Sequence, residues 1–266
     1  MPTVVSAQFT AQLTGRIPTV LRGWRGWAVV AAVWVVLTAL MPRVAPLHYL
    51  ALLALAVATQ LLPTLAVYDL PRPVPRARYW IAVWSLIFFA SDVLQRGISE
   101  WMGSNLWFYS VANPFEDAAL LMAYSYWQVR PVMRLAFRTA IPLLAIVTLA
   151  IAIYYGEVNT FKAISSPFRL LLLTTASAFT LIVRTAGEQD RIWDRDWLWT
   201  SLGVILYYAA YVVVDPVSRA LGSENLELLK LVYVVKAAVD VVAYLMVWKG
   251  MRCPVEPLSP YTSAPS

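Results

Sequence analysis

The sequence predicts an all-α membrane protein: a polytopic bundle of eight transmembrane helices, arranged as two parallel four-helix repeats. Three observations lead to this fold class: the composition, the spacing of apolar segments, and a match between the two halves of the chain. Apolar residues make up 60% and charged residues 14% of the 266 positions, and the mean hydropathy is +0.64. A soluble chain of this length is much less apolar, so the composition indicates a membrane protein.

Eight apolar segments are long enough to cross a bilayer, since a helix needs about 20 residues to cross ~30 Å of hydrocarbon. In chain order the segments are 25–42, 47–68, 79–97, 106–128, 137–155, 167–185, 197–215 and 226–248. The connections between them are short. They leave no room for a soluble catalytic or DNA-binding domain, so no nucleic-acid partner is predicted.

The two halves of the chain match most clearly in the third and seventh segments. Residues 80–104 align with residues 199–223, because each stretch begins with Trp, continues with apolar residues in register and ends with Gly-Ser. We therefore divide the membrane part into a first repeat, 25–131, and a second repeat, 132–252. Each repeat has an even number of crossings, so the two are expected to lie parallel.

The two ends of the chain differ from the membrane part. Residues 1–24 carry apolar residues at helical spacing with two arginines and no acidic residue, which predicts a helix on the cytoplasmic membrane surface. Residues 253–266 are rich in Pro and Ser, so we expect a disordered cytoplasmic tail.

Lys and Arg gather on one side of the predicted membrane: in the N-terminal segment, in the loops after the second, fourth and sixth helices, and after the eighth helix. The positive-inside rule makes this side cytoplasmic. We therefore expect a multi-pass protein of a bacterial inner membrane with both termini in the cytoplasm. Contact with anionic lipid headgroups explains the net charge of +6, so membrane lipids are the expected partners.

The chain has one histidine, His48, and one cysteine, Cys253. These two side chains cannot supply the ligands of a bis-histidine haem, an iron–sulfur cluster or a zinc site of the usual type. The sequence also has no glycine motif for phosphate or dinucleotide binding and no nucleophile-elbow motif. We therefore predict no cofactor and no metal site.

Polar side chains follow one face of the segment 106–128. Tyr109, Asn113, Glu116 and Asp117 are separated by steps of three and four residues, which return to the same side of a helix. The two acids lie near the middle of the segment, where an ionised side chain costs about 3 kcal/mol on insertion scales. We expect them to face a partner or a wet cavity rather than lipid.

The eighth segment repeats this pattern with Lys236, Asp240 and Tyr244. Two arrangements are open for the lysine: it pairs with Asp240 one turn away, or with Glu116 or Asp117 across the repeats. Either pairing can hold helices together or form part of a site.

The second and third segments contribute further polar groups. Asp92 and Arg96 lie one turn apart in the third segment, nearer its outer end, and we favour a structural role for this pair. Gln60 lies one turn before Pro63 in the second segment. Because proline frees a backbone carbonyl, we expect a kink at this point.

The stretch Pro114-Phe115-Glu116-Asp117 resembles the Pro-x-Glu-Glu/Asp motif of integral-membrane lycopene cyclases, which are small, internally duplicated polytopic proteins. The resemblance covers these four residues and implies that Glu116 and Asp117 are proton donors to an isoprenoid double bond. That family tends to carry the motif in both halves, whereas residues 237–240 here are Ala-Ala-Val-Asp. The chain also has more predicted crossings than the resemblance implies.

Three functions fit these features. The first is transport or binding of a small or lipophilic solute at a polar site between the repeats, near the bilayer midplane. The second is that of an accessory or scaffold subunit in a homo-oligomer or larger membrane complex. The third is an intramembrane enzyme that uses Glu116 or Asp117 as a general acid on a lipid or isoprenoid. We favour the first. The candidate residues for substrate binding or proton coupling are Glu116, Asp117, Asn113, Lys236, Asp240, Asp92, Arg96, Tyr109 and Tyr244.

Overall fold

All regular secondary structure among the described residues of the computed structural model is helical, as the sequence predicts. The structure describes residues 24–40, 47–70, 72–102, 106–157, 164–186, 192–221 and 225–254. The surface helix predicted within residues 1–24 and the tail predicted from residue 253 therefore lie almost entirely outside the described residues.

Eight helical segments occupy the positions of the eight predicted crossings. The helices are α2 (Trp24–Leu40), α3 (Leu47–Thr59), α4 (Leu61–Ala66), α5 (Arg76–Met102), α6 (Leu106–Trp127), α7 (Pro131–Tyr154), α8 (Ser165–Ala186), α9 (Asp196–Leu221) and α10 (Leu226–Met251). Short 3₁₀ turns, η1 (Val67–Asp69) and η2 (Ile192–Asp194), follow α4 and precede α9. Because α3 and α4 form one interrupted segment, the number of segments agrees with the prediction.

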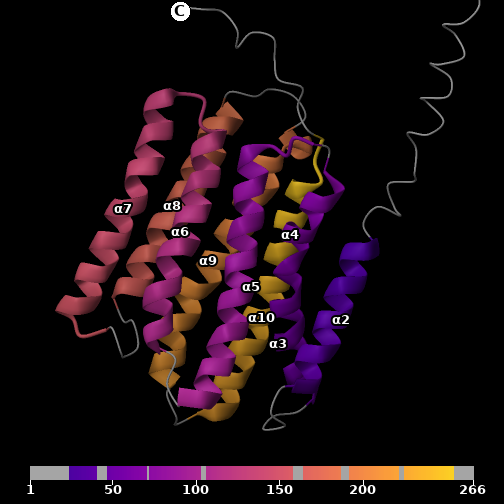
Figure 1. Ribbon diagram of the computed structural model, residues 1–266. Coiled ribbons are helices and arrows are strands. Elements are labelled where there is room, and N and C mark those ends of the chain that lie inside the picture. Colours follow the sequence, from indigo (N-terminus) through magenta and orange to yellow (C-terminus); the bar gives the residue numbers. More distant parts are fainter. Residues whose placement is uncertain are drawn as a thin grey trace, which may run out of the picture.

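The segments run side by side, with α2 at one end of the bundle and α7 at the other (Figure 1). The start of α2 and the end of α10 lie at the same end of the segments, as an even number of segments requires (Figure 1). The most extensive packing joins α9 to α10, α5 to α6, and α8 to α9. The relation of the two halves as repeats stays a prediction.

Six helical spans are long and apolar enough to cross a membrane: Leu47–Asp69, Arg76–Ile98, Pro131–Tyr154, Ser165–Ala186, Asp196–Val214 and Glu227–Met251. The remaining two segments lie alongside them. α2 is a shorter apolar helix of 17 residues. α6 has 22 residues, but its sequence is not apolar enough to count among these six spans, because Asn113, Glu116 and Asp117 interrupt its hydrophobic residues.

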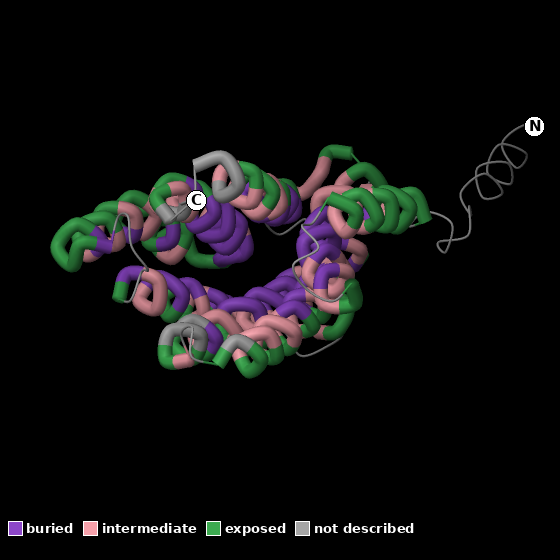
Figure 2. Tube along the Cα trace, turned by 90° about the horizontal axis from the view of Figure 1, so that it is seen from below, coloured by how far each residue is buried: buried purple, intermediate pink, exposed green. Residues whose placement is uncertain are grey.

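Large apolar side chains cover the outside of the bundle. Buried positions face inward and exposed positions face outward along most helices (Figure 2). Leu40, Leu143 and Ile182 are 73%, 62% and 67% exposed. A soluble protein rarely exposes so much contiguous apolar surface, whereas the hydrocarbon of a bilayer accommodates it. This apolar helical bundle has the architecture of an integral membrane protein.

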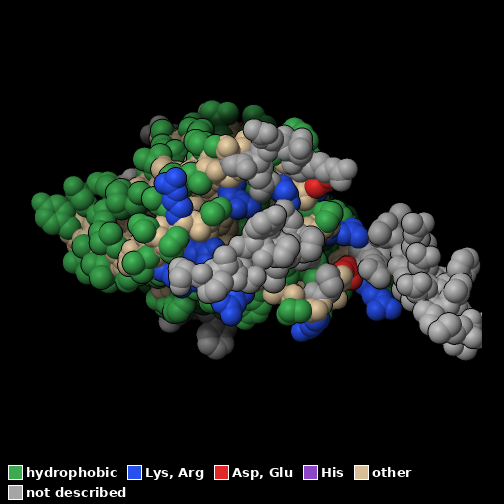
Figure 3. Space-filling view, turned by 90° about the horizontal axis from the view of Figure 1, so that it is seen from above, with side chains coloured by type: hydrophobic (Ala, Val, Ile, Leu, Met, Phe, Trp, Pro, Cys, Tyr) green, Lys and Arg blue, Asp and Glu red, His purple; other side chains and the backbone are tan. Residues whose placement is uncertain are grey.

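Lys and Arg gather at the end of the bundle where α2 begins and α10 ends (Figure 3). Arg76 begins α5, Arg130 precedes α7, and Arg184 and Lys249 lie in the last turns of α8 and α10. A cytoplasmic face is expected to have this charge. The orientation itself stays a prediction.

Arg78 ties three helices together at this basic end. Its Nε donates to Asp196 Oδ2 at 2.9 Å, Nη1 to the carbonyl of Met251 at 3.3 Å, and Nη2 to the carbonyl of Pro254 at 3.1 Å. The side chain is 2% exposed. From the sequence, Arg78 belongs to one of the basic loops on the predicted cytoplasmic side. In the structure its three donors join the starts of α5 and α9 to the end of α10.

The interruption between α3 and α4 agrees with the kink predicted from Pro63. α3 ends at Thr59 and α4 begins at Leu61, within one turn of the proline. Proline has no N–H to donate to the preceding turn, so a helix weakens there. The carbonyl of Gln60 accepts a hydrogen bond from the Ser85 hydroxyl of α5. The break therefore leaves a buried carbonyl that a neighbouring helix satisfies.

Two glycines allow α9 and α10 to approach closely. A Cβ added at Gly203 would lie 2.6 Å from the carbonyl oxygen of Ala243. A Cβ added at Gly250 would lie 2.8 Å from the carbonyl oxygen of Asp196. Small residues commonly permit such close contact between membrane helices.

Candidate functional site

Two carboxyl groups of α6 meet an arginine of α8 inside the bundle. Arg169 Nη1 lies 3.3 Å from Asp117 Oδ1 and 3.5 Å from Glu116 Oε2. The three residues are 7%, 3% and 3% exposed, in that order. One guanidinium thus faces two carboxylates, which leaves this cluster with a net charge of −1 when both acids are ionised.

The start of α8 sets the position of Arg169. The carboxylate of Glu157 accepts hydrogen bonds from the backbone N–H groups of Ile164 and Ser165, at 2.7 and 3.0 Å, and from the Ser165 hydroxyl at 2.7 Å. These bonds satisfy N–H groups that have no partner within the first turn of a helix, and a negative charge is favourable at this end. Arg169 follows one turn later and reaches α6.

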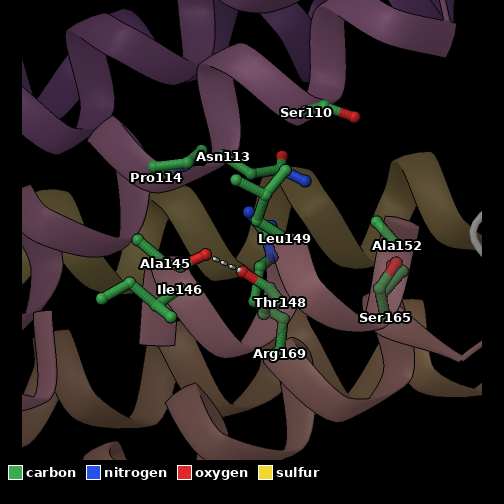
Figure 4. A pocket seen from close by; sticks show the side chains of 11 residues that line it. Ser110, Asn113, Pro114, Ala145, Ile146, Thr148, Leu149, Ala152, Ser165 and Arg169 are labelled. Carbon is green, nitrogen blue, oxygen red and sulfur yellow. Dashed lines mark hydrogen bonds between the residues drawn. The ribbon is translucent and has the colours of Figure 1, made fainter. Parts of the chain in front are cut away.

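A cavity of about 200 Å³ lies beside Arg169, between α6, α7 and α8. Asn113 and Arg169 approach it from facing helices, with Ser110 to one side (Figure 4). Ala145 and Leu149 are part of a mostly apolar wall that α7 contributes. The cavity lies toward the start of α8 and therefore away from the basic end of the bundle.

A second charged group lies on α10. Lys236 Nζ is 2.5 Å from Asp240 Oδ2, one turn further along the helix. The ammonium also lies 3.8 Å from the centre of the Tyr211 ring of α9, a favourable cation–π distance. The Tyr207 hydroxyl donates to the Tyr211 hydroxyl at 3.3 Å. Lys236 is therefore held by one carboxylate and one aromatic face.

Asp92 of α5 joins this second group. Gln60 Nε2 donates to Asp92 Oδ2 at 2.6 Å. Asp92 also interacts electrostatically with Lys236 and Arg96. The break before α4 thus presents an amide to this half-buried acid, and Arg96 acts on Asp92 over a longer range than Gln60.

Buried aromatic rings lie between the two charged groups. Trp84 stacks on Tyr244 with ring centres 5.7 Å apart, and both side chains are 1% exposed. Tyr244 interacts electrostatically with Asp92. Tyr208, also fully buried, interacts electrostatically with Arg169. The aromatic layer therefore connects the α6–α8 charges to the α5–α10 charges.

Negative charges outnumber positive ones among the described residues of this interior. The carboxyl groups belong to the buried Glu116, Asp117 and Asp240 and the half-buried Asp92, and the cationic groups to the buried Arg169 and the half-buried Lys236 and Arg96. An unbalanced charge in an apolar interior is costly, so the group as a whole favours taking up a proton or a cation.

The structure places the predicted site residues in two connected groups. Asn113 lines the cavity, and Tyr244 belongs to the aromatic layer. Lys236 pairs with Asp240 on its own helix, so one of the two arrangements left open by the sequence is found. The side chain of Tyr109 lies outside the described part of the chain.

Arg169 is a candidate site residue that the sequence interpretation does not identify. Its position inside the apolar segment 167–185 was the available signal, because an arginine within a membrane helix requires a buried partner.

No group of three or more His, Cys, Asp or Glu side chains that could hold a metal ion occurs within the described ranges. The groups that surround the cavity are a guanidinium, an amide, hydroxyls and apolar side chains. They can bind a solute through hydrogen bonds and charge.

Comparisons of the chain with protein-family models, with curated proteins and with solved structures find no match.

Proposed function

We propose that this integral membrane protein binds a small solute in the cavity between α6, α7 and α8 and transports it across the membrane, with the adjoining buried carboxyl groups taking up protons. The observation that carries this proposal is the cavity of about 200 Å³ next to the buried Arg169, Glu116 and Asp117. Ligand sites are commonly mostly apolar cavities with a few polar groups, and many transporters place such a site between their helix repeats.

The packing around the charges supports a binding role over a purely structural one. Polar residues that only hold helices together are expected to be enclosed by neighbouring side chains. Arg169 instead has the carboxylates on one side and an open cavity on another. Asn113 and Ser110 of α6 line the same cavity.

The position of the cavity also supports the proposal. α6 belongs to the first predicted repeat, and α7 and α8 belong to the second. The proposed site thus lies between the two predicted repeats. It is displaced from the predicted midplane toward the end opposite the chain termini, and we propose that this end faces away from the cytoplasm.

The enzyme and scaffold alternatives have less support. Glu116 and Asp117 are not among the residues that line the cavity, whereas a carboxylic acid that protonates an alkene must reach its substrate. The outer apolar surface is expected for any protein in lipid and does not favour a protein partner. A scaffold would still leave the cavity without a role.

Cysteine accessibility tests the proposal. Cys253 is the single cysteine of the chain, so a Cys253→Ser background carries no other thiol. In that background, Asn113→Cys is expected to react with a membrane-impermeant methanethiosulfonate from both sides of oriented vesicles, because a transported solute must enter from one side and leave to the other.

A matched control comes from the same helix. Leu120 is fully buried in the core, so Leu120→Cys should stay unreactive from both sides. Reaction of Asn113→Cys from one side only would contradict transport and leave binding. No reaction from either side, with the protein folded, would contradict a solute cavity altogether.

A further inference from the structure

The hydrogen-bond donors of the cavity differ in whether they are already used. The Ser165 hydroxyl donates to Glu157 and the Thr148 hydroxyl donates to carbonyls of its own helix. Ser110 Oγ and Arg169 Nε are buried and have no hydrogen-bond partner among the described residues. Two donors on residues that line the cavity are therefore unsatisfied within the described part of the chain.

The two carboxylates contact only part of the Arg169 guanidinium. Both carboxylate contacts, to Glu116 and Asp117, use the single nitrogen Nη1. Nε is not used. A guanidinium presents five N–H donors in a planar fork, and this geometry matches a carboxylate better than it matches any neutral group.

We propose that the solute is a small carboxylic acid, bound as its carboxylate by Arg169 and Asn113 together with one proton that neutralises Glu116 or Asp117. This inference rests on the proposed function and specifies its ligand. Glu116 and Asp117 are not part of the cavity lining, so the ligand meets the cation of the cluster and not its acids.

The charges around Arg169 explain why a proton must accompany the anion. The cluster has a net charge of −1 before binding, and a bound carboxylate would make it −2 in an apolar interior. The titratable groups that face the cluster are Tyr207 and Tyr208 from α9 and Asp92 from α5. None of these is a cation, and the α7 residues of the lining carry no charge. Proton uptake by one α6 carboxyl group restores the original net charge.

The apolar wall of the cavity indicates what the part of the ligand beyond its carboxylate should be. Ala145, Ile146 and Leu149 of α7 face the polar groups across the cavity (Figure 4). An acid with a short apolar substituent would place its carboxylate on Arg169 and its hydrocarbon on α7. A long-chain fatty acid presents the same carboxylate, with its chain extending into lipid.

Isothermal titration calorimetry of the full chain in detergent tests the proposal. Benzoate and butyrate are the water-soluble probes, palmitate is the lipid-derived probe, and benzamide is the uncharged control. Titrations in buffers of different ionisation enthalpy count the protons taken up. We expect a carboxylate to bind with uptake of about one proton and with higher affinity at lower pH.

Variants assign the effect to the cavity. Arg169→Lys keeps the charge but loses the fork, and Asn113→Leu removes an amide from the lining; each should weaken carboxylate binding by at least about tenfold, the expected loss for a hydrogen bond to a charged group. Glu116→Gln or Asp117→Asn should retain binding while reducing the proton uptake. Arg130→Gln, an exposed arginine, is the matched control and should change nothing.

The outcomes separate this inference from the proposed function. Binding of benzoate or butyrate supports a soluble acid, and binding of palmitate alone supports a lipid-derived acid. Carboxylates that bind no better than benzamide, or without proton uptake, or equally well to Arg169→Lys and Asn113→Leu, would overturn the inference. If Asn113→Cys is accessible in that case, the solute cavity stands and only the ligand class is wrong.

Discussion

Arg169 of α8 contacts Asp117 of α6 at 3.3 Å between Nη1 and Oδ1, and both side chains are more than nine-tenths buried. The contact joins a helix of the first predicted repeat to a helix of the second. It also places a cation between a pair of acids and a cavity, and this position fits both a structural role and the binding role proposed above.

Removal of Arg169 is expected to destabilise the fold. Arg169→Gln leaves Glu116 and Asp117 buried without their cation, and loss of one partner of a buried ion pair costs about 3–5 kcal/mol. The triple variant with Glu116→Gln and Asp117→Asn should recover much of this loss because it removes the unbalanced charges. Unfolding in mixed detergent micelles measures both. Equal stability of the single variant and the native chain would show that the contact is not made.

A double-mutant cycle tests the pair on α10. Lys236→Met and Asp240→Leu should each destabilise the protein strongly, because each leaves an opposite charge buried, and the double variant should be less destabilised than the sum of the two. The exposed pair Lys230–Glu227, 2.8 Å apart, is the control from the same helix. Its removal should change stability by less than about 1 kcal/mol. Additive effects at the buried pair would contradict the interaction.

The α9–α10 contact should not tolerate a side chain at Gly203. The added Cβ of Gly203→Ala would lie 2.6 Å from a backbone oxygen, so the helices must move apart. We expect a loss of about 1–3 kcal/mol, typical of overpacking. Gly97→Ala is the matched helical control, since nothing lies within 4 Å of its Cβ. That control should be neutral or stabilising by up to about 1 kcal/mol. Thermal unfolding of the two variants side by side gives the comparison.

Arg78 should be hard to replace even by lysine. Its three nitrogens bind Asp196 and the carbonyls of Met251 and Pro254, and one ammonium cannot reach all three positions. Arg78→Lys is therefore expected to loosen the end of α10, which proteolysis at the C-terminal end of α10 detects. Cleavage rates equal to those of the native chain would contradict this assignment.

The thiol of Cys253 should be poorly reactive at neutral pH. Burial raises its pKa to about 11, and the negative charge of Asp196 acts in the same direction. Because the pKa of this thiol is higher in the folded than in the unfolded protein, its contribution to the free energy of unfolding is complete below about pH 8.5. That contribution is lost as the pH rises through 11. Iodoacetamide should modify the folded protein much more slowly than the unfolded protein at pH 8, with the rate rising toward pH 11. Comparison with Cys253→Ser isolates the effect on stability.

Much of the fold could be predicted from the sequence because hydrophobic length determines where membrane helices lie. The predicted segment 106–128 and the observed α6, Leu106–Trp127, agree within one residue. The helix of the third segment extends beyond the predicted crossing: α5 runs from Arg76 to Met102, because polar residues continue the helix past its apolar part, Arg76–Ile98.

The partners of the buried charges were harder to predict. Spacing along one helix suggested the contact of Lys236 with Asp240, since both lie on one strip of α10. The contact of Arg169 with Glu116 and Asp117 depends on how α8 packs against α6, which periodicity does not specify. The cavity depends on side chains from three helices, so no single segment could indicate it.

The most direct test of a solute site in the α6–α7–α8 cavity is a native mass spectrum of the gently solubilised protein beside that of a variant with a blocked cavity, Ser110→Phe. We expect a small acidic molecule bound to the native chain and absent from a folded Ser110→Phe protein. Stoichiometric partner chains with no small ligand, or an adduct that Ser110→Phe retains, would contradict it.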